Sequence, residues 1–418
     1  MELIPSLLLF VATFSICFFL VNSFWLWINE QRRKLQLKSN IALSIPVWTN
    51  LPRPFQCVDY HPTQSMETRQ SSSKSQSLTV LSWNIERGLK LEELTQTMKE
   101  LDPDILLLQE VDISCHRSGF VDEMTHFCNT LGTNGTFSAE FEELESPVRK
   151  PDNGGGGVHG NAILTKHSLL ETFSVVHTEV VDWDGNGGII YSEPRKGGRV
   201  AVGAIVGTPL GNILAYTLHL EPFCCCIQRQ QQVEDVLLHA NNLLKTSKHK
   251  IDCVVLGGDM NTMISGTGRL NRFLPLVSLD IPKTPRYCPN PVKPPKFWRQ
   301  PSPNFLSIAG RFHHPFRGED QCMAEFIEKS QKSKREVDPS LSLLSLQDPF
   351  RKGRGAEWTL TNYHGLFKGK LDFLMYSVDS AFELKRKQTQ TFVSEDKMES
   401  DHLYLLIELQ LKKNKKET

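Results

Sequence analysis

The sequence has no excess of either charge. Its 47 Lys and Arg residues equal its 47 Asp and Glu residues, so the formal net charge is zero. A strongly positive whole-protein field, such as attracts nucleic acid at long range, is therefore missing. Any polyanionic substrate must be bound by a local basic patch. With 39% hydrophobic and 22% charged residues, the composition is that of a globular protein and excludes a disordered or fibrous one.

The ten cysteines include no C-x-x-C pair, which argues against a structural zinc site. The run Cys224-Cys225-Cys226 is also a poor basis for a disulfide framework, because adjacent residues of a strand point in opposite directions. We therefore expect reduced, partly buried thiols in a reducing compartment.

The N-terminus carries a long hydrophobic run. Residues 3–28 are almost wholly apolar, which exceeds the roughly 20 residues that a helix needs to cross a bilayer. Trp25 and Trp27 lie at the end of this run, where aromatic residues favour the membrane interface. The basic residues 32–34 follow, whereas only Glu2 precedes. The positive-inside rule then predicts that everything after residue 30 lies in the cytosol.

The alternative is a cleaved signal peptide, for which Ser23 would be an acceptable cleavage position. Against it, the run lacks a preceding positive charge and is longer than the apolar part of most signal peptides. We favour an uncleaved signal anchor in a single-pass membrane protein. Processing into the secretory pathway remains the alternative, and only there would the sequon at residues 134–136 be glycosylated.

The chain divides into three parts. Residues 1–30 form the expected transmembrane helix, residues 31–77 a basic juxtamembrane segment and polar linker, and residues 78–412 one catalytic domain. Val233, Leu237, Ala240 and Leu244 repeat at helical spacing and predict an amphipathic helix over 229–245. Apolar runs typical of strands alternate with such patterns, which indicates a layered α/β architecture. The expected strands are 78–85, 105–111, 161–165, 200–206, 213–220, 253–256, 371–376 and 403–411.

One stretch, residues 270–340, departs from this alternation. It is rich in proline and basic side chains and has little periodicity. A loop of this length within a compact domain is either functional or disordered. We favour a solvated insertion in the catalytic domain.

Polar side chains gather at the ends of the expected strands, where α/β enzymes place their sites. Each alone would be a turn or capping residue, or a hydrogen-bonded surface histidine. Their ordered recurrence next to apolar strands is what points to a common site. The residues are Asn84, Glu110, His219, Asp259, Asn261, Asp372, Asp401 and His402.

With these residues in this order, the sequence resembles the endonuclease/exonuclease/phosphatase superfamily over about residues 78–411. The resemblance implies a DNase I-like α/β fold, a four-layer α/β/β/α sandwich with two central sheets and helices outside. It also implies metal-dependent phosphoester chemistry, without specifying the substrate. The motifs that carry it are LSWNIERG (81–88), LLLQEVD (106–112), HGNAILTK (159–166), YTLHLE (216–221), LGGDMN (256–261), KLDFLMYS (370–377) and SDH (400–402).

Such chemistry needs a hard cation, because a phosphodiester is an anion that repels nucleophiles. The resemblance implies that Glu110, with Asn84 and Asp401, holds Mg²⁺, for which Mn²⁺ would be a substitute. Oxygen ligands of this kind suit both ions.

The remaining roles also follow from the resemblance. Asp259 would orient or deprotonate the attacking water, and Asn261 would position the phosphate. His402 would donate to a non-bridging oxygen, kept cationic by Asp372. His219 would contact the phosphate or assist the leaving group.

The leading hypothesis for function is a nucleic-acid phosphodiesterase: an endonuclease, an exonuclease or an enzyme similar to 5′-tyrosyl-DNA phosphodiesterases. Basic and aromatic residues of the insertion would offer charge and stacking to a polynucleotide, although a solvated loop explains them equally well. Trp358 is either a stacking surface or a core residue. The basic residues are Arg286, Lys293, Lys296, Arg299, Arg311 and Arg317, and the aromatic ones are Phe297, Trp298 and Phe312.

Two other classes of function are considered. A lipid phosphodiesterase or phosphatase, of the sphingomyelinase or inositol-phosphatase sort, would explain a membrane anchor, but the sequence has no compelling apolar docking loop. A catalytically inactive binding protein is disfavoured because the polar set is intact. The expected partners are a phosphodiester substrate and, through the N-terminal helix, a lipid bilayer; nothing indicates an obligate protein partner.

Overall fold

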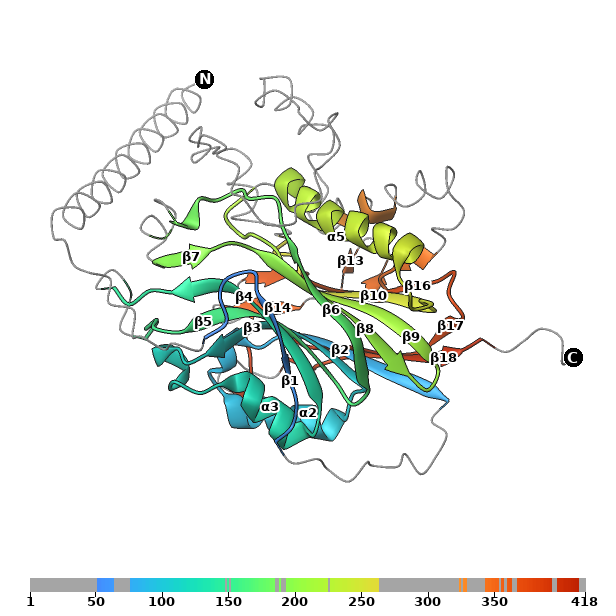
Figure 1. The fold of residues 1–418 in the computed structure, drawn as a ribbon, viewed down its shortest axis with the longest axis horizontal. Helices are drawn as coiled ribbons and strands as arrows, with labels where there is room; N and C mark the ends of the chain where they lie inside the picture. Colours follow the sequence, from blue (N-terminus) through green and yellow to red (C-terminus); the bar gives the residue numbers. More distant parts are fainter. Residues whose placement is uncertain are drawn as a thin grey trace, which may run out of the picture.

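The computed structural model of the chain (Figure 1) describes the catalytic domain in segments. The expected transmembrane helix, most of the linker, most of the insertion and Trp358 lie outside the described residues. Among the described residues, no helix has the length and apolar character needed to cross a membrane. The described residues are 51–63, 76–146, 149, 152–184, 188, 193–224, 226–262, 323–324, 326–328, 343–352, 355–356, 359–362, 367–392 and 397–412.

The first sheet is built around a parallel pair, β2 and β3, and its other neighbours are antiparallel. A short strand, β7 (Arg195–Gly197), adds to the side of β4. In spatial order the strands are β1 (Cys57–Tyr60), β4 (Asn134–Glu143), β5 (Val158–Thr165), β3 (Ile105–Ile113), β2 (Ser77–Asn84), β18 (Leu405–Leu411) and β17 (Phe382–Thr389).

The second sheet also has one parallel pair, β9 and β10, among antiparallel neighbours. In spatial order its strands are β11 (Leu346–Gln347), β16 (Asp372–Ser377), β10 (Cys253–Asp259), β9 (Gly211–His219), β8 (Val200–Thr208) and β6 (Ser168–Val176). Two small hairpins pair β12 (Arg351–Lys352) with β13 (Gly355–Ala356) and β14 (Leu360–Asn362) with β15 (Phe367–Gly369).

Alternation along the strands explains how the two sheets pack. On β3, Ile105 and Leu107 face the second sheet and contribute to one core, while Leu106 and Leu108 face the other way into a second core. Successive side chains of a strand point to opposite faces, so an uninterrupted apolar run is buried on both. Burial of each such side chain contributes about 1.5–3 kcal/mol.

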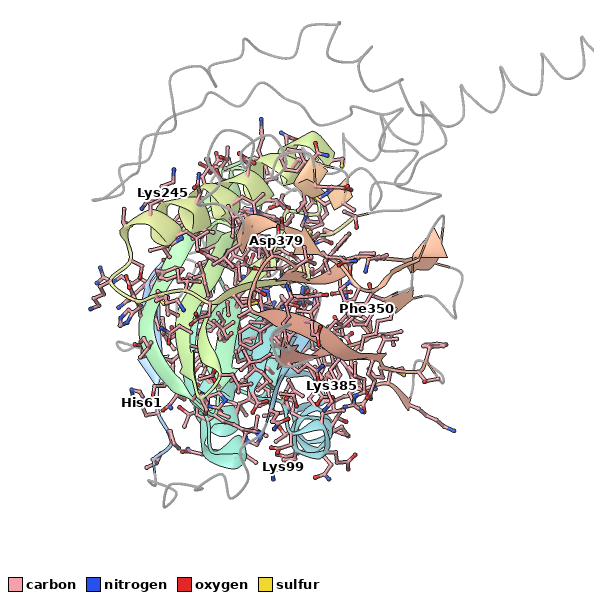
Figure 2. The ribbon with its side chains drawn as sticks, turned by 90° about the vertical axis from the view of Figure 1, so that its right-hand side faces the viewer. His61, Lys99, Lys245, Phe350, Asp379 and Lys385 are labelled. Atoms are coloured by element: carbon pink, nitrogen blue, oxygen red, sulfur yellow. The ribbon has the colours of Figure 1, made fainter. Side chains whose placement is uncertain are left out.

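Helices cover the two outer faces (Figure 1). α2 (Leu91–Leu101) and α3 (Glu123–Leu131) pack on the first sheet, and α5 (Cys226–Thr246) packs on the second. In Figure 2, Lys99 of α2 and Lys245 of α5 lie at opposite outer faces of the molecule. The four layers are thus helix, sheet, sheet and helix, as the resemblance implied.

All eight expected strands and the expected helix are present, most of them longer than predicted. The sequence interpretation did not identify α2, α3, β1, β4, β6 or β17. Most of these lie at the edge of a sheet or on its outside, where half-buried patterns give a weaker signal than continuous apolar runs.

Two further expectations are settled in part. Met323 and Ile327 of the predicted insertion are buried in the core beneath α5, so the insertion is not solvated at these two positions. Cys115, Cys128 and Cys253 are buried thiols outside any disulfide, as the composition predicted.

Candidate active site at the sheet edges

Three neighbouring strands of the second sheet bring His219, Asp259 and Asp372 into one row. Asp259 of β10 is paired in register with His219 of β9 and with Asp372 of β16. Gly258 allows this pairing: its φ is +140°, and a Cβ there would lie 2.0 Å from the carbonyl oxygen of Leu218. Any larger residue would push β10 away from β9, so the row requires glycine at this position.

The loop after β2 is tied to the loop before β18. Ser400 Oγ donates to the carbonyl oxygen of Asn84 over 2.7 Å, and the backbone N–H of His402 donates to Ser400 Oγ over 3.1 Å. The backbone N–H of Asp401 donates to Glu86 Oε2 over 3.0 Å. The bonds from Ser400 to Asn84 and from Asp401 to Glu86 join segments more than three hundred residues apart in sequence and place Asp401 and His402 beside the row.

His402 and Asp372 form a buried pair. His402 Nδ1 lies 2.9 Å from Asp372 Oδ2. Burial alone would lower the pKa of His402, but Asp372, Asp401 and Asp259 together raise it well above the ordinary histidine value. The imidazole is therefore a cation at neutral pH, with its Nε2 3.7 Å from Asp259 Oδ2.

Asp259 lies at the centre of the site. Its Oδ1 accepts the backbone N–H of Asn261 over 2.7 Å, and its Oδ2 lies 3.7 Å from His219 Nε2. Burial raises the pKa of Asp259 to about 7; the charge of His402 opposes this rise, and that of Asp372 adds to it. A carboxyl group with such a pKa is an effective proton acceptor near neutral pH.

His219 has the opposite ionisation state from His402. Burial and the charge of Arg199 lower the pKa of His219 well below its ordinary value, so the ring is neutral. Arg199 Nη1 lies 2.9 Å from His219 Nδ1. A guanidinium can only donate, so Nδ1 accepts and the ring proton is on Nε2. That N–H faces Asp259 and Glu110, whose Oδ2 and Oε1 lie 3.7 and 3.8 Å away.

A set of carboxylates lies on the first-sheet side of the site. Burial raises the pKa of Glu86 to about 7, and repulsion from Asp401 and Glu110 adds to the rise. The pKa of Asp401 is also raised by burial and by Glu110, although His402 opposes the change. Mutually repelling carboxylates with oxygen donors fit a divalent cation of the hard class.

Asn84 holds two of the acidic groups in place. Its Nδ2 donates to Glu110 Oε1 and to Asp259 Oδ2, over 3.1 Å in each case. Its Oδ1 accepts the backbone N–H of Glu86 over 3.1 Å. Asn84 thereby orients the carboxylates of both sheets toward one another.

Two tighter groups of possible metal ligands are less suitable for a cation. Glu140, His159 and His219 bring ligand atoms within 4.8 Å of one another, but Arg199 Nη1 already donates to Glu140 Oε2 over 2.8 Å. The second group is Asp259, Asp372 and His402, whose imidazole is already cationic. The carboxylates Glu86, Glu110 and Asp401 offer a further set of oxygen donors of the kind that a hard divalent cation takes, with Asn84 donating to Glu110.

Unusual backbone conformations gather at this site. Glu86, Arg87, Glu110 and Asn261 all have a positive φ, between 48° and 61°, which side-chain-bearing residues rarely adopt. Glu110 lies in a bulge of β3 rather than at the end of its strand, which corrects the sequence expectation. Strained positions of this kind cluster where a site needs a particular side-chain direction.

A hollow of about 190 Å³ opens onto these groups. Of the predicted residues, Glu110, His219, Asp259, Asn261 and His402 line it directly. Asn84 and Asp372 lie behind them as hydrogen-bond partners, and Asp401 is next to His402 in the chain. All eight predicted site residues thus come together.

The other lining residues were not predicted as site residues. Arg87 and His159 lie within the motifs LSWNIERG and HGNAILTK, and Arg199 directly precedes an expected strand, so charged residues at strand ends were the available signal. Glu86 lies in the first motif, directly after an expected strand, and was not predicted as a site residue either. The unpredicted lining residues are Arg87, His159, Glu193, Arg195, Arg199, Pro222 and Phe223.

Several solved structures are similar to the chain at low identity. One is an endonuclease/exonuclease/phosphatase from Beutenbergia cavernae DSM 12333, with 16% identity, a TM-score of 0.48, and coverage of 80% of this chain and 72% of that chain. Another is the human Nocturnin catalytic domain with a bound sulfate anion, with 17% identity, a TM-score of 0.45 and coverage of 86% and 100%. A third is ANGEL2, a 2′,3′-cyclic phosphatase, with 14% identity, a TM-score of 0.45 and coverage of 80% and 95%.

No curated protein matches the sequence. The profile of the endonuclease/exonuclease/phosphatase family, however, matches residues 81–402. This span covers more than half of the chain and includes every predicted site residue. The chain therefore belongs to the endonuclease/exonuclease/phosphatase family, whose members are phosphoric ester hydrolases.

Proposed function

We propose that the protein is a Mg²⁺-dependent phosphodiesterase that acts on nucleic acid. The observation that carries this proposal is the position of Asp259, whose Oδ2 lies 3.7 Å from the Nε2 atoms of both His219 and His402. One proton acceptor thus lies between a neutral donor and a cationic donor, beside a set of carboxylates.

In the proposed reaction, Asp259 takes a proton from water as the water oxygen forms its bond to phosphorus. The bond from phosphorus to the leaving oxygen breaks, and that oxygen takes a proton from solvent. Mg²⁺, held by Glu110 and Asp401 with Glu86 nearby, would neutralise charge on the phosphate as a Lewis acid.

The two histidines serve the developing negative charge in different ways. His402, kept cationic by Asp372, donates from Nε2 to a non-bridging oxygen. His219 donates from Nε2 as a neutral group, because Arg199 engages its Nδ1. This favours a phosphate contact for His219 over a role as proton donor to the leaving group. Asn261, which lines the hollow, positions the phosphate.

The substrate class is inferred from the hollow. Arg87, Arg195 and Arg199 line it together with Phe223, whose side chain is 42% exposed. Guanidinium groups suit phosphates, and an aromatic ring suits a nucleobase. This combination supports a nucleic-acid or nucleotide substrate without requiring the basic residues of the insertion.

A lipid phosphodiesterase is the second candidate. Leu89 and Phe120 are 49% and 50% exposed, and they follow two short 3₁₀ turns that contact each other, Glu86–Gly88 and His116–Ser118. An apolar pair near the site would suit a membrane surface. Leu89→Ser with Phe120→Ser is expected to impair hydrolysis of phosphodiester lipids in vesicles only if this candidate is correct.

The test of the proposed function is hydrolysis by the purified chain of single-stranded and duplex DNA, RNA, 5′-tyrosyl DNA, sphingomyelin and inositol phosphates, with Mg²⁺ or with EDTA. We expect turnover of a nucleic acid with Mg²⁺ and none with EDTA. Glu110→Gln is expected to lower the rate at saturating Mg²⁺ at least about tenfold with little change in thermal midpoint. A variant with more than a tenth of the wild-type rate would exclude Glu110 as an essential ligand.

We also propose that residues 1–30 anchor the protein in a membrane with the catalytic domain in the cytosol. The supporting features are the apolar run and the basic residues after it. The full-length protein is expected to keep its unprocessed mass, resist carbonate extraction and expose residues after 30 to cytosolic protease. A glycan on Asn134 would show that the orientation is wrong.

A further inference from the structure

One wall of the hollow, formed by Arg87, Glu193 and Arg195, begins next to the proposed metal ligand Glu110. Arg87 Nε is 3.6 Å from Glu110 Oε2, and Arg87 Nη2 is 3.2 Å from Glu193 Oε1. Glu193 Oε2 in turn pairs with Arg195 Nη2. The contacts therefore run from Glu110 through Arg87 and Glu193 to Arg195, and Arg87, Glu193 and Arg195 all line the hollow.

The guanidinium groups behind this wall share their carboxylates. Glu143 is shared by Arg117, Arg149 and Arg195, and Asp112 pairs with Arg117. With Arg87, Glu193 and Glu110 included, four guanidinium groups share four carboxylates in the described network, and Glu110 is the carboxylate assigned to the proposed cation. Asp112 also contacts His159, which lines the hollow too.

Arg195 has hydrogen-bonding capacity that the protein leaves unused. It is only 4% exposed, yet its Nε makes no hydrogen bond and lies 3.7 Å from Glu143 Oε1. Its guanidinium carbon lies 4.5 Å from the ring centre of Phe141 and 4.6 Å from that of Trp183. Two aromatic rings thus fix the guanidinium in position beside the hollow.

The electrostatic environment of Arg195 agrees with this geometry. Burial lowers the pKa of Arg195 to about 10; Glu143 opposes the change, and Arg199, Arg117 and Arg87 add to it. Neighbouring positive charges thus act on a guanidinium that lines the hollow. An anion there would relieve the repulsion.

We propose that Arg87 and Arg195 bind a second phosphate group of the substrate, adjacent to the phosphoester that is hydrolysed. The proposal rests on the proposed function, because it assigns the hydrolysed phosphoester to the Asp259 side of the hollow. The substrate class is then a nucleotide or oligonucleotide that bears a phosphate on both sides of one nucleoside. Pro222 and Phe223 line the same hollow and offer an apolar surface to that nucleoside.

Two features distinguish this wall from a structural ion network. Arg87 has a side chain that is 29% exposed, so it is reachable from solvent. Glu193, the carboxylate that lines the wall, contacts both Arg87 and Arg195, so its charge is already matched. The guanidinium groups of Arg87 and Arg195 can each make a bidentate contact to a phosphate.

The test uses chromogenic esters that differ by one phosphate. The probes are thymidine 5′-(p-nitrophenyl phosphate), the same ester with a 3′-phosphate, and the isomer with the ester on O3′ and the phosphate on O5′. With Mg²⁺, the wild-type chain is expected to prefer at least one phosphorylated ester by about tenfold or more in kcat/KM, chiefly through KM. Arg87→Gln and Arg195→Lys are each expected to reduce this preference to below about threefold.

Arg386→Gln is the matched control. Arg386 has a side chain that is 58% exposed on β17 and pairs with Glu408, so its loss is expected to leave both the rate and the preference unchanged. A wild-type preference below about twofold, or a preference that both wall variants retain, would overturn the proposal. If Arg195→Lys fails to fold by circular dichroism, Arg87→Gln decides the matter.

A binding measurement separates this proposal from the proposed function. In EDTA, thymidine 3′,5′-bisphosphate is expected to bind at least about tenfold more tightly than thymidine 5′-monophosphate by calorimetry, and Arg87→Gln is expected to remove the difference. If no ester is hydrolysed but this binding preference is found, the proposed phosphodiesterase activity is rejected and the second phosphate site at Arg87 and Arg195 is retained. If the esters are hydrolysed but neither the kinetic nor the binding preference for a second phosphate is found, the phosphodiesterase activity is retained and the second phosphate site is rejected.

Discussion

At the residue scale, two buried histidines of the same site differ in charge, because His402 has carboxylate neighbours and His219 has a guanidinium neighbour. His402 lies against Asp372 and is cationic, whereas His219 lies against Arg199 and is neutral. Each histidine therefore offers one N–H from Nε2, but only His402 brings a positive charge. The division of roles follows from the partner on Nδ1 in each case.

Replacement of Asp372 by Asn tests the cationic state of His402. Burial lowers the pKa of His402, and Asp372 is the largest influence that raises it, so Asp372→Asn is expected to lower this pKa. His402 must be protonated to donate from Nε2, so the alkaline limb of the pH–rate profile is expected to move to lower pH. An unchanged limb together with an unchanged rate would refute the pairing.

Asp259 is expected to reduce stability at high pH in the absence of metal. Its pKa is raised to about 7 in the folded chain, against about 4 unfolded. The folded state then binds more protons, and the free energy of unfolding falls as pH rises from about 4 to about 7. Asp259→Asn is therefore expected to abolish turnover yet be more stable than wild type at pH 8, by a difference on the order of 3 kcal/mol.

The measurement is chemical denaturation in EDTA at pH 5 and pH 8. The advantage of Asp259→Asn should grow between these two values. Asp59→Asn, on an exposed position of β1, is the control and should follow the wild type at both. An advantage that is equal at both pH values would contradict the raised pKa.

At the scale of elements, the site depends on how closely β9 and β10 approach. Gly258 lies opposite Leu218, and a Cβ there would be 2.0 Å from the Leu218 carbonyl oxygen. The parallel pairing continues through Asp259 and His219, so a larger side chain at position 258 would displace both functional side chains. The alternation on β3 has a similar role on the first sheet, where a bulge turns Glu110 toward the site.

Gly258→Ala is expected to destabilise the fold by about 3 kcal/mol or more and to lower activity further than stability alone explains. The physical reason is a clash of the new Cβ with Leu218 O at a φ that disfavours alanine. Gly119→Ala is the control: Gly119 also has a positive φ, of 71°, but a Cβ there would have nothing within 4 Å. If both variants lose equal stability in urea denaturation, close strand approach is not the cause.

At the scale of the whole molecule, the site joins the two sheets. Asn84 of β2 donates to Asp259 of β10, and His402 before β18 pairs with Asp372 of β16. A cation held by carboxylates of this site would therefore stabilise the packed domain. Binding that occurs only in the folded state raises stability in proportion to the logarithm of ligand concentration.

Mg²⁺ is expected to raise the thermal midpoint of the wild-type chain, with a stabilisation of about 2.7 kcal/mol at a concentration one hundred times the dissociation constant. Glu110→Gln should show a much smaller rise, because one ligand is lost. Differential scanning fluorimetry with Mg²⁺ and with EDTA measures both. An equal rise in the two proteins would place the cation elsewhere.

The sequence by itself determined the strands with continuous apolar runs and the residues at their ends. Val200 to Val206 and Cys253 to Leu256 were predictable because strands buried on both faces carry no polar residue to interrupt the pattern. Asp259 and His219 were predictable as site residues because the family's motifs place them after such strands. These signals are local, and local signals can be read from a sequence.

Only the tertiary structure decided which charges meet. Burial and Arg199, 20 residues away in the chain, keep His219 neutral. Glu193 contacts both Arg195 and Arg87, and Arg87 lies 106 residues before Glu193. Neither the carboxylate that an arginine pairs with nor the depth of its burial follows from a local pattern, because both depend on how the two sheets pack. The ionisation of the site and its arginine wall are therefore properties of the folded chain.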